Sequence, residues 1–398
     1  MEEKDKKKQA MKILIIRAFP DKLDLNSYNV QEIGLARALA VKGHQCDVVL
    51  YNGKEKDRKE VYTFAQNDCK YRFLIYWLKG YSVLKNGFMP SVKKLIAQYD
   101  VIQVHEYDQI LSWKLYSEPQ KPTVIYHGPY YHPYTKGYNF KCRVFDLLFL
   151  RRGSYNSIVA LTKSRLAADF LEKKGFSHVT PVGVGINSDN FHLATKENHR
   201  ILSTKKKNRL QLLYVGKIED RRNVYFMVDA FRKVRQLHPD IQLNIIGDGE
   251  KEYREAFFKS IEKEVQEETI LYRQKATQAE LTDIYQEADI FLFTSNYEIF
   301  GMVLLEAMYF GLPVVSTLNG GSSTLIQDGV NGYVLEGFDV EQWTEKLDML
   351  LKDRDKRLAM GQRARKTIQT GFTWECLTGK FENAYQQAIE LFGLNDNQ

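Results

Sequence analysis

The feature that most limits how this chain can fold is an alternation of short apolar runs with longer amphipathic stretches, which occurs twice. In the first half, the apolar runs are typical of buried parallel strands, and residues with helical spacing follow the first and the last run. The expected strands are residues 11–16, 46–51, 101–105, 123–127 and 157–161, and the expected helices are residues 33–40 and 164–174. This alternation predicts βαβ units and a parallel sheet.

The same alternation resumes after a polar, lysine-rich stretch that we interpret as a linker. Strands are expected at residues 210–215, 241–246, 290–294 and 313–316, and helices at residues 225–237, 250–267 and 373–392. We therefore predict an α/β fold with two Rossmann-like, doubly wound parallel-sheet domains that face each other across a cleft. The predicted boundaries are 11–191 for the first domain, 192–208 for the linker, 209–372 for the second domain, and 373–398 for a helix packing back toward the first domain.

Length and composition exclude several classes of protein. A chain of 398 residues exceeds what one hydrophobic core usually holds, and 44% hydrophobic residues suffice for folded cores. The formal charge of +7 is lower than an obligate nucleic-acid binder suggests, and it fits anionic substrates or an anionic membrane surface. Cys46, Cys69, Cys142 and Cys376 are scattered without metal-ligand spacing, which favours a reducing cytoplasm. We expect neither a signal peptide nor a membrane-spanning segment.

Two glutamates eight positions apart, Glu298 and Glu306, flank the glycine at position 301. We expect a loop carboxylate, the free N–H groups of a helix start, and a second carboxylate inside that helix. Helix N-termini attract phosphate, and carboxylates accept hydrogen bonds from sugar hydroxyls. This arrangement suits a nucleotide-sugar. The alternative is that Glu298 is an ordinary first-turn acid and Glu306 an exposed helix residue.

These residues resemble motifs of the retaining glycosyltransferases of family 4 (glycosyl transferases group 1), which have the GT-B fold. The segment from Glu298 to Glu306 matches that family's E-x7-E motif. Residues 214–222 and 244–250 resemble its phosphate-binding loop and the following strand and turn, and residues 311–321 continue in register. Several matches in one order are more specific than any single match. The resemblance is weak in the first half of the chain.

The resemblance implies that Lys217 and Arg222 bind the donor diphosphate, with Gly216 and Gly247 in the adjoining turns. Cations at this point would stabilise the negative charge that develops on the leaving group. At these two positions the family more often has Arg first and Lys second, whereas this chain has Lys217 and then Arg222. The positive charge at each position is the same, but the planar guanidinium stands at the other position. The alternative is that both side chains merely solvate a loop.

The resemblance also assigns residues to the two ends of the donor. It implies that Glu298 holds hydroxyls of the donor sugar and that Glu306 holds the ribose hydroxyls. The intervening donor-binding residues are expected to be Ile299, Phe300, Gly301 and Met302. His127 resembles the family's histidine that contacts the donor sugar, although a histidine at a strand end is often structural. The implied catalytic set is His127, Glu298, Lys217 and Arg222.

The acceptor side is less clearly marked. The candidates are Asn29, His105 and Tyr130. The family's first loop usually carries a Gly-Gly pair, whereas residues 18–32 contain no glycine. This departure keeps open a catalytically silent homologue.

We expect no cofactor, because the nucleotide-sugar is a substrate, and we expect no metal requirement, because the one D-x-D triplet considered has another explanation. Asp353 and Asp355 form a D-x-D triplet, which holds a metal in other glycosyltransferases. Here the triplet lies in a Lys/Arg-rich helical region, and we predict that it caps and solvates a helix.

Two segments of the first half, residues 70–85 and 140–152, interleave basic and aromatic side chains. Amphipathic segments of this composition lie in membrane interfaces. We hypothesise that the first domain docks on an anionic cytoplasmic leaflet and receives a lipid-linked acceptor; the alternative is core helices with solvated basic edges. Single-stranded nucleic acid is a weaker interpretation, and no nucleic-acid partner is expected.

The sequence thus predicts a cytoplasmic, peripheral retaining glycosyltransferase with a UDP-sugar donor favoured. The second domain would bind the donor, and the first would bind a glycan or lipid-linked acceptor of cell-envelope or capsular polysaccharide synthesis. The alternatives are a nucleotide-sugar epimerase or hydrolase of similar architecture and a non-catalytic glycosyltransferase partner.

Overall fold

A computed structural model describes residues 9–21, 23–25, 30–150, 155–187 and 209–395 of the chain. The predicted linker, residues 192–208, lies outside these residues. The described chain divides into two compact units. The first comprises the described residues within 1–131, 135–185 and 374–398, and the second comprises those within 132–134 and 186–373. The prediction of an α/β fold with two doubly wound domains is confirmed.

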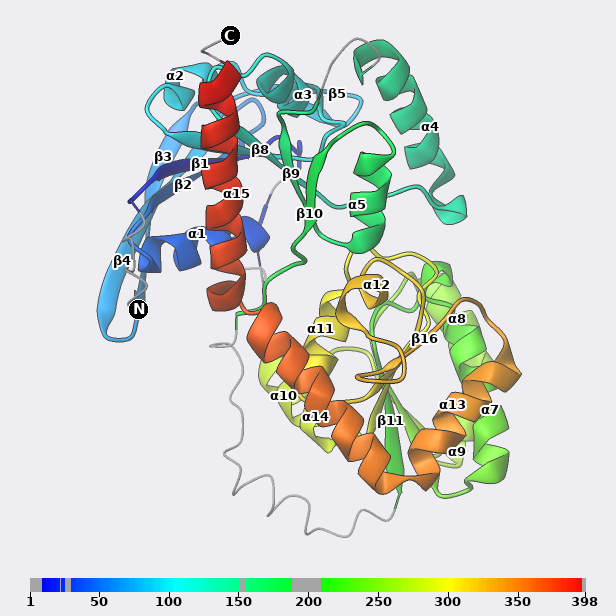
Figure 1. Ribbon diagram of the computed structural model, residues 1–398. Coiled ribbons are helices and arrows are strands. Elements are labelled where there is room, and N and C mark those ends of the chain that lie inside the picture. Colours follow the sequence, from blue (N-terminus) through cyan, green and yellow to red (C-terminus); the bar gives the residue numbers. More distant parts are fainter. Residues whose placement is uncertain (1–8, 22, 26–29, 151–154, 188–208, 396–398) are drawn as a thin grey trace. The chain divides into compact units, whose positions relative to one another are not determined.

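The first unit is built on a sheet of eight strands in the order β10-β9-β8-β7-β1-β2-β4-β3. Figure 1 labels the strands of this sheet except β7. All neighbouring strands run parallel except β3 and β4. The strands are β1 (Lys12–Arg17), β2 (Gln45–Tyr51), β3 (Arg58–Gln66), β4 (Cys69–Leu78), β7 (Val101–His105), β8 (Thr123–His127), β9 (Val159–Thr162) and β10 (His178–Pro181), with a separate hairpin of β5 (Tyr81–Val83) and β6 (Asn86–Phe88). The helices are α1 (Gln31–Val41), α2 (Val92–Ile96), α3 (Ile110–Ser117), α4 (Lys136–Phe145), α5 (Arg165–Glu172) and α15 (Trp374–Asn395), with the π-helical turn η2 (Asp146–Leu150) after α4.

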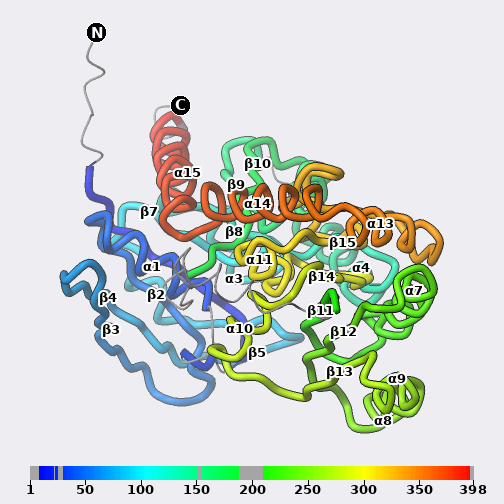
Figure 2. The backbone as a smooth tube through the Cα atoms, turned by 90° about the horizontal axis from the view of Figure 1, so that it is seen from below, coloured from blue at the N-terminus to red at the C-terminus, as the bar shows by residue number. Residues whose placement is uncertain are grey.

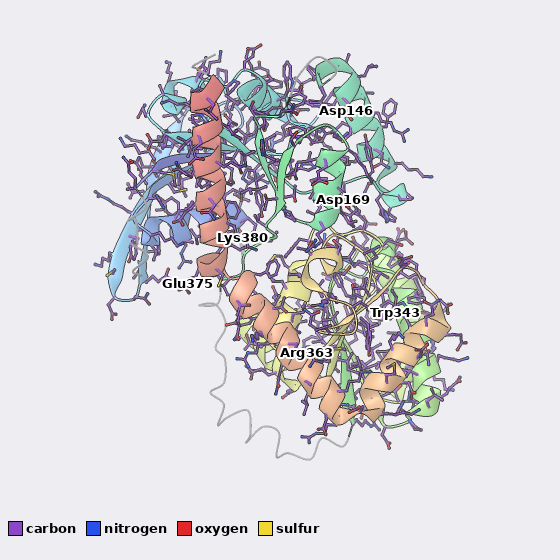
Figure 3. All side chains as sticks on the ribbon, in the orientation of Figure 1. Asp146, Asp169, Trp343, Arg363, Glu375 and Lys380 are labelled. Atoms are coloured by element: carbon purple, nitrogen blue, oxygen red, sulfur yellow. The ribbon has the colours of Figure 1, made fainter. Side chains whose placement is uncertain are left out.

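The second unit has a fully parallel sheet of six strands in the order β13-β12-β11-β14-β15-β16. Figure 2 shows β13 to β15 in that order. The strands are β11 (Leu210–Val215), β12 (Ile241–Ile246), β13 (Ile270–Arg273), β14 (Ile290–Phe293), β15 (Val314–Thr317) and β16 (Tyr333–Leu335). The helices are η4 (Asp220–Arg222), α7 (Val224–Leu237), α8 (Lys251–Ser260), α9 (Glu262–Gln266), α10 (Gln278–Glu287), α11 (Met302–Tyr309), α12 (Ser322–Leu325), α13 (Val340–Lys352) and α14 (Arg354–Gly371). The core between helices and sheet includes Trp343 of α13, which is fully buried and labelled in Figure 3.

Two local expectations are wrong. Residues 250–267 form two helices, α8 and α9, because the chain turns at Ile261, whose side chain is fully buried. Most of the basic–aromatic segment 70–85 forms strands β4 and β5 and no helix. In β4 the burial alternates, with Phe73, Ile75 and Trp77 buried, and this period of two is that of a strand.

The C-terminal helix α15 belongs to the core of the first unit. It packs against α1 and against β7, β8 and β9 (Figure 1). Leu377, Phe381 and Tyr385 are fully buried on the side that meets the sheet. Each such side chain contributes roughly 1.5–3 kcal/mol by leaving water, so α15 supplies a substantial share of this core.

A buried hydrogen bond between Glu382 and His44 and an ion pair between Glu382 and Lys42 hold α15 against the turn between α1 and β2, and their removal should destabilise the first unit. The carboxylate of Glu382 lies 3.0 Å from Nε2 of His44 and 3.2 Å from Nζ of Lys42. Glu382→Ala would leave the buried imidazole without its acceptor, and we expect a loss of about 2 kcal/mol in the free energy of unfolding. Urea unfolding followed by circular dichroism measures it. Glu390→Ala, at an exposed position of the same helix, is the control, and an equal effect of both substitutions would contradict the role of the pair.

Candidate functional site

The sheet of the second unit reverses its winding between β11 and β14, which are neighbours although β12 and β13 separate them along the chain. Ligands of doubly wound sheets bind outside the carboxyl ends of the strands at such a switch point. The loops that leave this edge are residues 216–222 after β11 and residues 294–301 after β14. These two loops carry half of the candidate site residues that the sequence selected.

The two loops are joined by an arginine–glutamate cluster. Arg222, on the loop after β11, forms an ion pair with the carboxylate of Glu298 and donates a hydrogen bond of 3.0 Å to the hydroxyl of Ser295. Arg221 pairs with the same carboxylate and donates to the carbonyl of Tyr297 at 2.6 Å. The structure thus brings together two predicted site residues, Arg222 and Glu298. The structure adds Arg221 to this cluster. The family motif does not include Arg221, and the only signal for it in the sequence is its position next to Arg222.

A cavity of about 850 Å³ opens beside this cluster, at the ends of β11, β12 and β13. Its lining includes Gly216, Lys217, Gly247 and Gln274. The volume lies in the range of ligand pockets. Lys217 is exposed and forms no ion pair with any residue that the structure describes. It therefore offers the cavity a cation whose charge is not already compensated.

Two glycines set the backbone geometry of the site. A Cβ atom at Gly247 would lie 1.7 Å from the carbonyl oxygen of Gly216, so only glycine permits this approach of the two loops. Gly301 has a φ of 83°, which favours glycine, and it directly precedes α11. The prediction that Gly301 opens this helix is confirmed.

Helix α11 carries the second glutamate of the motif. Glu306 is buried and accepts a hydrogen bond of 2.9 Å from the hydroxyl of Tyr285. The alternative of an exposed helix residue is therefore wrong for Glu306. Among the intervening residues, Phe300 is buried and Met302 begins the helix, while Ile299 precedes them on the loop. Neither glutamate is among the residues that line the cavity.

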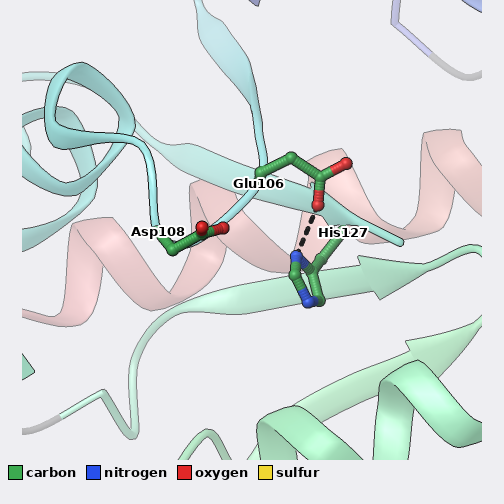
Figure 4. A group of neighbouring side chains, drawn as sticks. All are labelled: Glu106, Asp108 and His127. Carbon is green, nitrogen blue, oxygen red and sulfur yellow. Dashed lines mark ion pairs between the residues drawn. The ribbon is translucent and has the colours of Figure 1, made fainter. Parts of the chain in front are cut away.

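The first unit holds His127 at the end of β8 in a fully buried position (Figure 4). Its Nδ1 lies 2.6 Å from Oε2 of Glu106, as an ion pair without well-directed hydrogen-bond geometry. The ring stacks on Phe170, with centroids 5.4 Å apart. Its Nε2 has no hydrogen-bond partner among the described residues. Glu106 thus fixes one edge of the ring and leaves the other edge for further bonding.

Glu106 is the least expected residue of this group. It has a φ of 59°, an uncommon backbone conformation for a residue with a side chain and one that often accompanies functional sites. Its carboxylate also accepts the N–H of Gly128 at 2.9 Å and pairs with Lys163 at 3.2 Å. Burial alone would raise the pKa of Glu106, but Lys163, His127 and the Gly128 N–H together hold that pKa below its ordinary value. The residue is therefore a carboxylate at neutral pH.

Glu106, Asp108 and His127 bring their ligand atoms within 4.8 Å of one another, a spacing that a metal ion could bridge (Figure 4). Each carboxylate, however, already has a lysine partner, since Asp108 pairs with Lys141 at 2.8 Å. This charge balance favours an ion-pair network over a cation site. In the second unit, Asp353 of the D-x-D triplet accepts the N–H of Lys356 at 2.9 Å and caps α14, as predicted.

The acceptor-side candidates lie apart from any described cavity. His105 is buried, with Nδ1 3.3 Å from Glu32 and Nε2 3.3 Å from the amide of Gln103. Burial lowers the pKa of His105 to about 4, so the ring is neutral, and its two contacts favour a structural role. Tyr130 is also buried. Asn29 lies outside the residues that the structure describes.

A family model matches most of the sequence of the second unit. Residues 195–367 match the family model "Glycosyl transferases group 1". The chain is 28% identical over 289 residues to the sulfoquinovosyl transferase SQD2 of Arabidopsis thaliana, which covers 70% of this chain and 54% of that protein. Other leading curated relatives are likewise matched over about half of their length or less.

Solved structures with this architecture cover nearly the whole chain. A sucrose-phosphate synthase from Thermosynechococcus elongatus has a TM-score of 0.70 at 16% identity, covering 95% of this chain and 99% of that one. HepE of Anabaena in complex with UDP and glucose has a TM-score of 0.66 at 16% identity, covering 94% and 99%. These likenesses confirm the predicted GT-B fold.

Proposed function

Because residues 195–367 match the family model "Glycosyl transferases group 1", we propose that the protein is a glycosyltransferase that uses a nucleotide-diphosphate-sugar. The observation that carries the proposal is the pairing of an uncompensated cation, Lys217, with a cavity at the carboxyl edge of a doubly wound sheet. The arginine–glutamate cluster adjoins it through the same loop. A cavity for a nucleotide next to cations for a diphosphate and a carboxylate for sugar hydroxyls matches the three parts of such a donor.

The proposed chemistry is a metal-independent transfer that retains the anomeric configuration. Lys217 and Arg222 stabilise the diphosphate as the glycosidic bond breaks, and Glu298 accepts hydrogen bonds from the sugar hydroxyls. Glu306 is assigned to the ribose, and His127 to the reacting sugar. Glu106 serves as a positioning residue, because its carboxylate lies 2.6 Å from Nδ1 of His127 and fixes that edge of the ring.

We favour a UDP-sugar as the donor, in keeping with the UDP that HepE binds. The acceptor is a hydroxyl of a glycan or lipid-linked precursor of a cell-envelope or capsular polysaccharide, received by the first unit at an anionic membrane surface. No helix in the described ranges combines the length and the apolarity needed to cross a lipid bilayer.

A nucleotide screen tests the proposal. Thermal unfolding would be followed with UDP, GDP and dTDP, each free and as a sugar conjugate. At a hundredfold excess over Kd, the bound nucleotide should add about 2.7 kcal/mol to stability and raise the unfolding temperature. Stabilisation by one base only would identify the donor, and the absence of stabilisation by every nucleotide would contradict the proposal.

Product analysis separates transfer from the rival activities. With the identified donor, a transferase should form a glycoside only when an acceptor is present. Free sugar released at the same rate with and without acceptor would indicate a hydrolase, and a donor with altered sugar stereochemistry would indicate an epimerase. Nucleotide binding without any turnover would favour a non-catalytic partner.

A further inference from the structure

Helix α4 and the turn η2 present an apolar face to solvent. The face consists of Phe140, Val144, Leu147 and Leu148, whose exposed fractions are 71%, 40%, 60% and 67%. We propose that this face, which we call the docking face, inserts into the headgroup region of an anionic lipid bilayer. The proposal deepens the membrane partner of the proposed function and rests on that function only for the choice of a membrane-bound acceptor.

The spacing of these four residues makes one continuous stripe. They stand at positions i, i+4, i+7 and i+8, which lie on one side of a helix. At a rise of about 1.5 Å per residue, the stripe is roughly 12 Å long. A stripe of this length can lie in the plane of a membrane interface, where apolar faces sink roughly 5–10 Å.

The opposite side of the same segment is anchored to the domain. Cys142, Phe145 and Leu150 are buried, and the ring of Phe149 packs on Trp113 of α3 with centroids 4.8 Å apart. Because these contacts already hold the segment, the apolar residues of the docking face are not needed to pack α4 and remain available to a partner.

The charge around the docking face is positive. Lys136 and Arg143 are exposed and form no ion pair with any residue in the described ranges. The acid of this segment, Asp146, labelled in Figure 3, is paired with Lys174. Lys141 is compensated by Asp108. The unbalanced charge is therefore that of Lys136 and Arg143, which complements anionic headgroups.

The same charge argues against a second copy of this chain as the occupant. In a twofold contact each copy offers the same patch, so the docking face would meet another face that also carries Lys136 and Arg143. A bilayer with anionic lipids buries the apolar side chains and neutralises both cations at once. We therefore assign the face to a lipid surface.

Vesicle co-sedimentation of the full chain tests this assignment. Vesicles of phosphatidylcholine with phosphatidylglycerol should bind the protein at low salt, and vesicles of phosphatidylcholine alone should bind it at least tenfold more weakly. The double substitution Leu147→Glu and Leu148→Glu should lower binding at least tenfold. Leu237→Glu, at a leucine of α7 with 57% exposure, is the matched control and should leave binding unchanged.

The charges can be tested separately. Replacing Lys136 and Arg143 by glutamine should weaken binding about fivefold for each residue and reduce its dependence on salt. Failure of the wild-type protein to bind anionic vesicles at low salt would overturn the proposal. So would a dimer in sedimentation velocity that the Leu147/Leu148 substitutions dissociate, since the occupant would then be a second copy.

Failure of the docking-face proposal can be distinguished from failure of the proposed glycosyltransferase function. The docking-face variants should keep the nucleotide-induced thermal shift of the wild-type protein, because the nucleotide cavity lies in the other unit. If the variants lose vesicle binding but keep the nucleotide-induced thermal shift, the result bears only on the docking face. If the wild-type protein shows no nucleotide-induced thermal shift, the result bears only on the proposed function.

Discussion

Lys217→Ala is expected to lower kcat for sugar transfer about a hundredfold, with a much smaller change in KM. The lysine lines the cavity that we propose for the nucleotide and has no ion-pair partner among the described residues, so its charge would act on a bound diphosphate. Negative charge on the diphosphate increases as the glycosidic bond breaks. A fixed cation therefore stabilises the transition state more than the ground state, and losing one such group typically costs about 100–1,000-fold in kcat. Steady-state kinetics with the donor found in the nucleotide screen measures the effect.

Lys263→Ala is the control for charge. Lys263 lies on α9 with 82% of its side chain exposed, outside the residues that line the cavity. This variant should transfer at the wild-type rate. A rise in KM without a fall in kcat in Lys217→Ala would show uniform binding in place of transition-state stabilisation.

Glu298→Gln is expected to lower kcat/KM by about a hundredfold or more. The substitution removes a strong acceptor for sugar hydroxyls, and it leaves Arg221 and Arg222 without the carboxylate that both contact. Mispositioning of Arg222 would then add to the loss, because a guanidinium at the diphosphate acts only from the correct place. The affinity for UDP alone should stay within about threefold of wild type, since the sugar contact is absent from that ligand.

Glu219→Gln separates this role from a general effect of charge. Glu219 pairs with Nη2 of Arg221 at 2.8 Å and lies 3.8 Å from Nε of Arg222. Its loss leaves the Glu298 pairs in place, and we expect less than about a fivefold change, as for a partly exposed ion pair. Near-wild-type transfer by Glu298→Gln, or an equal loss in Glu219→Gln, would contradict the assignment.

Much of the fold follows from local pattern. The strands Val101–His105, Thr123–His127 and Ile241–Ile246 were predicted to the residue, because buried parallel strands are continuous apolar runs. Strands β3 and β4 were missed, since their hairpin has one half-exposed side and its aromatic and basic residues resemble an amphipathic helix. Whether this segment forms strands or a helix is decided by the pairing of β4 with β2. This pairing is a long-range contact that the local sequence pattern does not contain.

The site could be predicted from the sequence only as a set of candidate residues. Two of these candidates, Arg222 and Glu298, form an ion pair, and Gly301 directly precedes α11, whereas their roles toward a donor stay predictions. Arg221 and Glu106 were missed for different reasons. Arg221 belongs to no recognised motif. The position of Glu106 depends on a backbone conformation with positive φ, which cannot be predicted from the residues around it. A contact such as Glu106 with His127 joins the ends of two strands and appears only once the sheet is assembled.

The position of α15 has a practical consequence for anyone who wishes to study the halves of this protein separately. A fragment ending near residue 187 would expose β7, β8 and β9 where Leu377, Phe381 and Tyr385 now cover them. Such a fragment should aggregate. A soluble first half would need residues 374–395 supplied as a fused or co-expressed peptide. Proteolysis or truncation within α15 would therefore destabilise the first unit and not the second unit that directly precedes α15 in the chain.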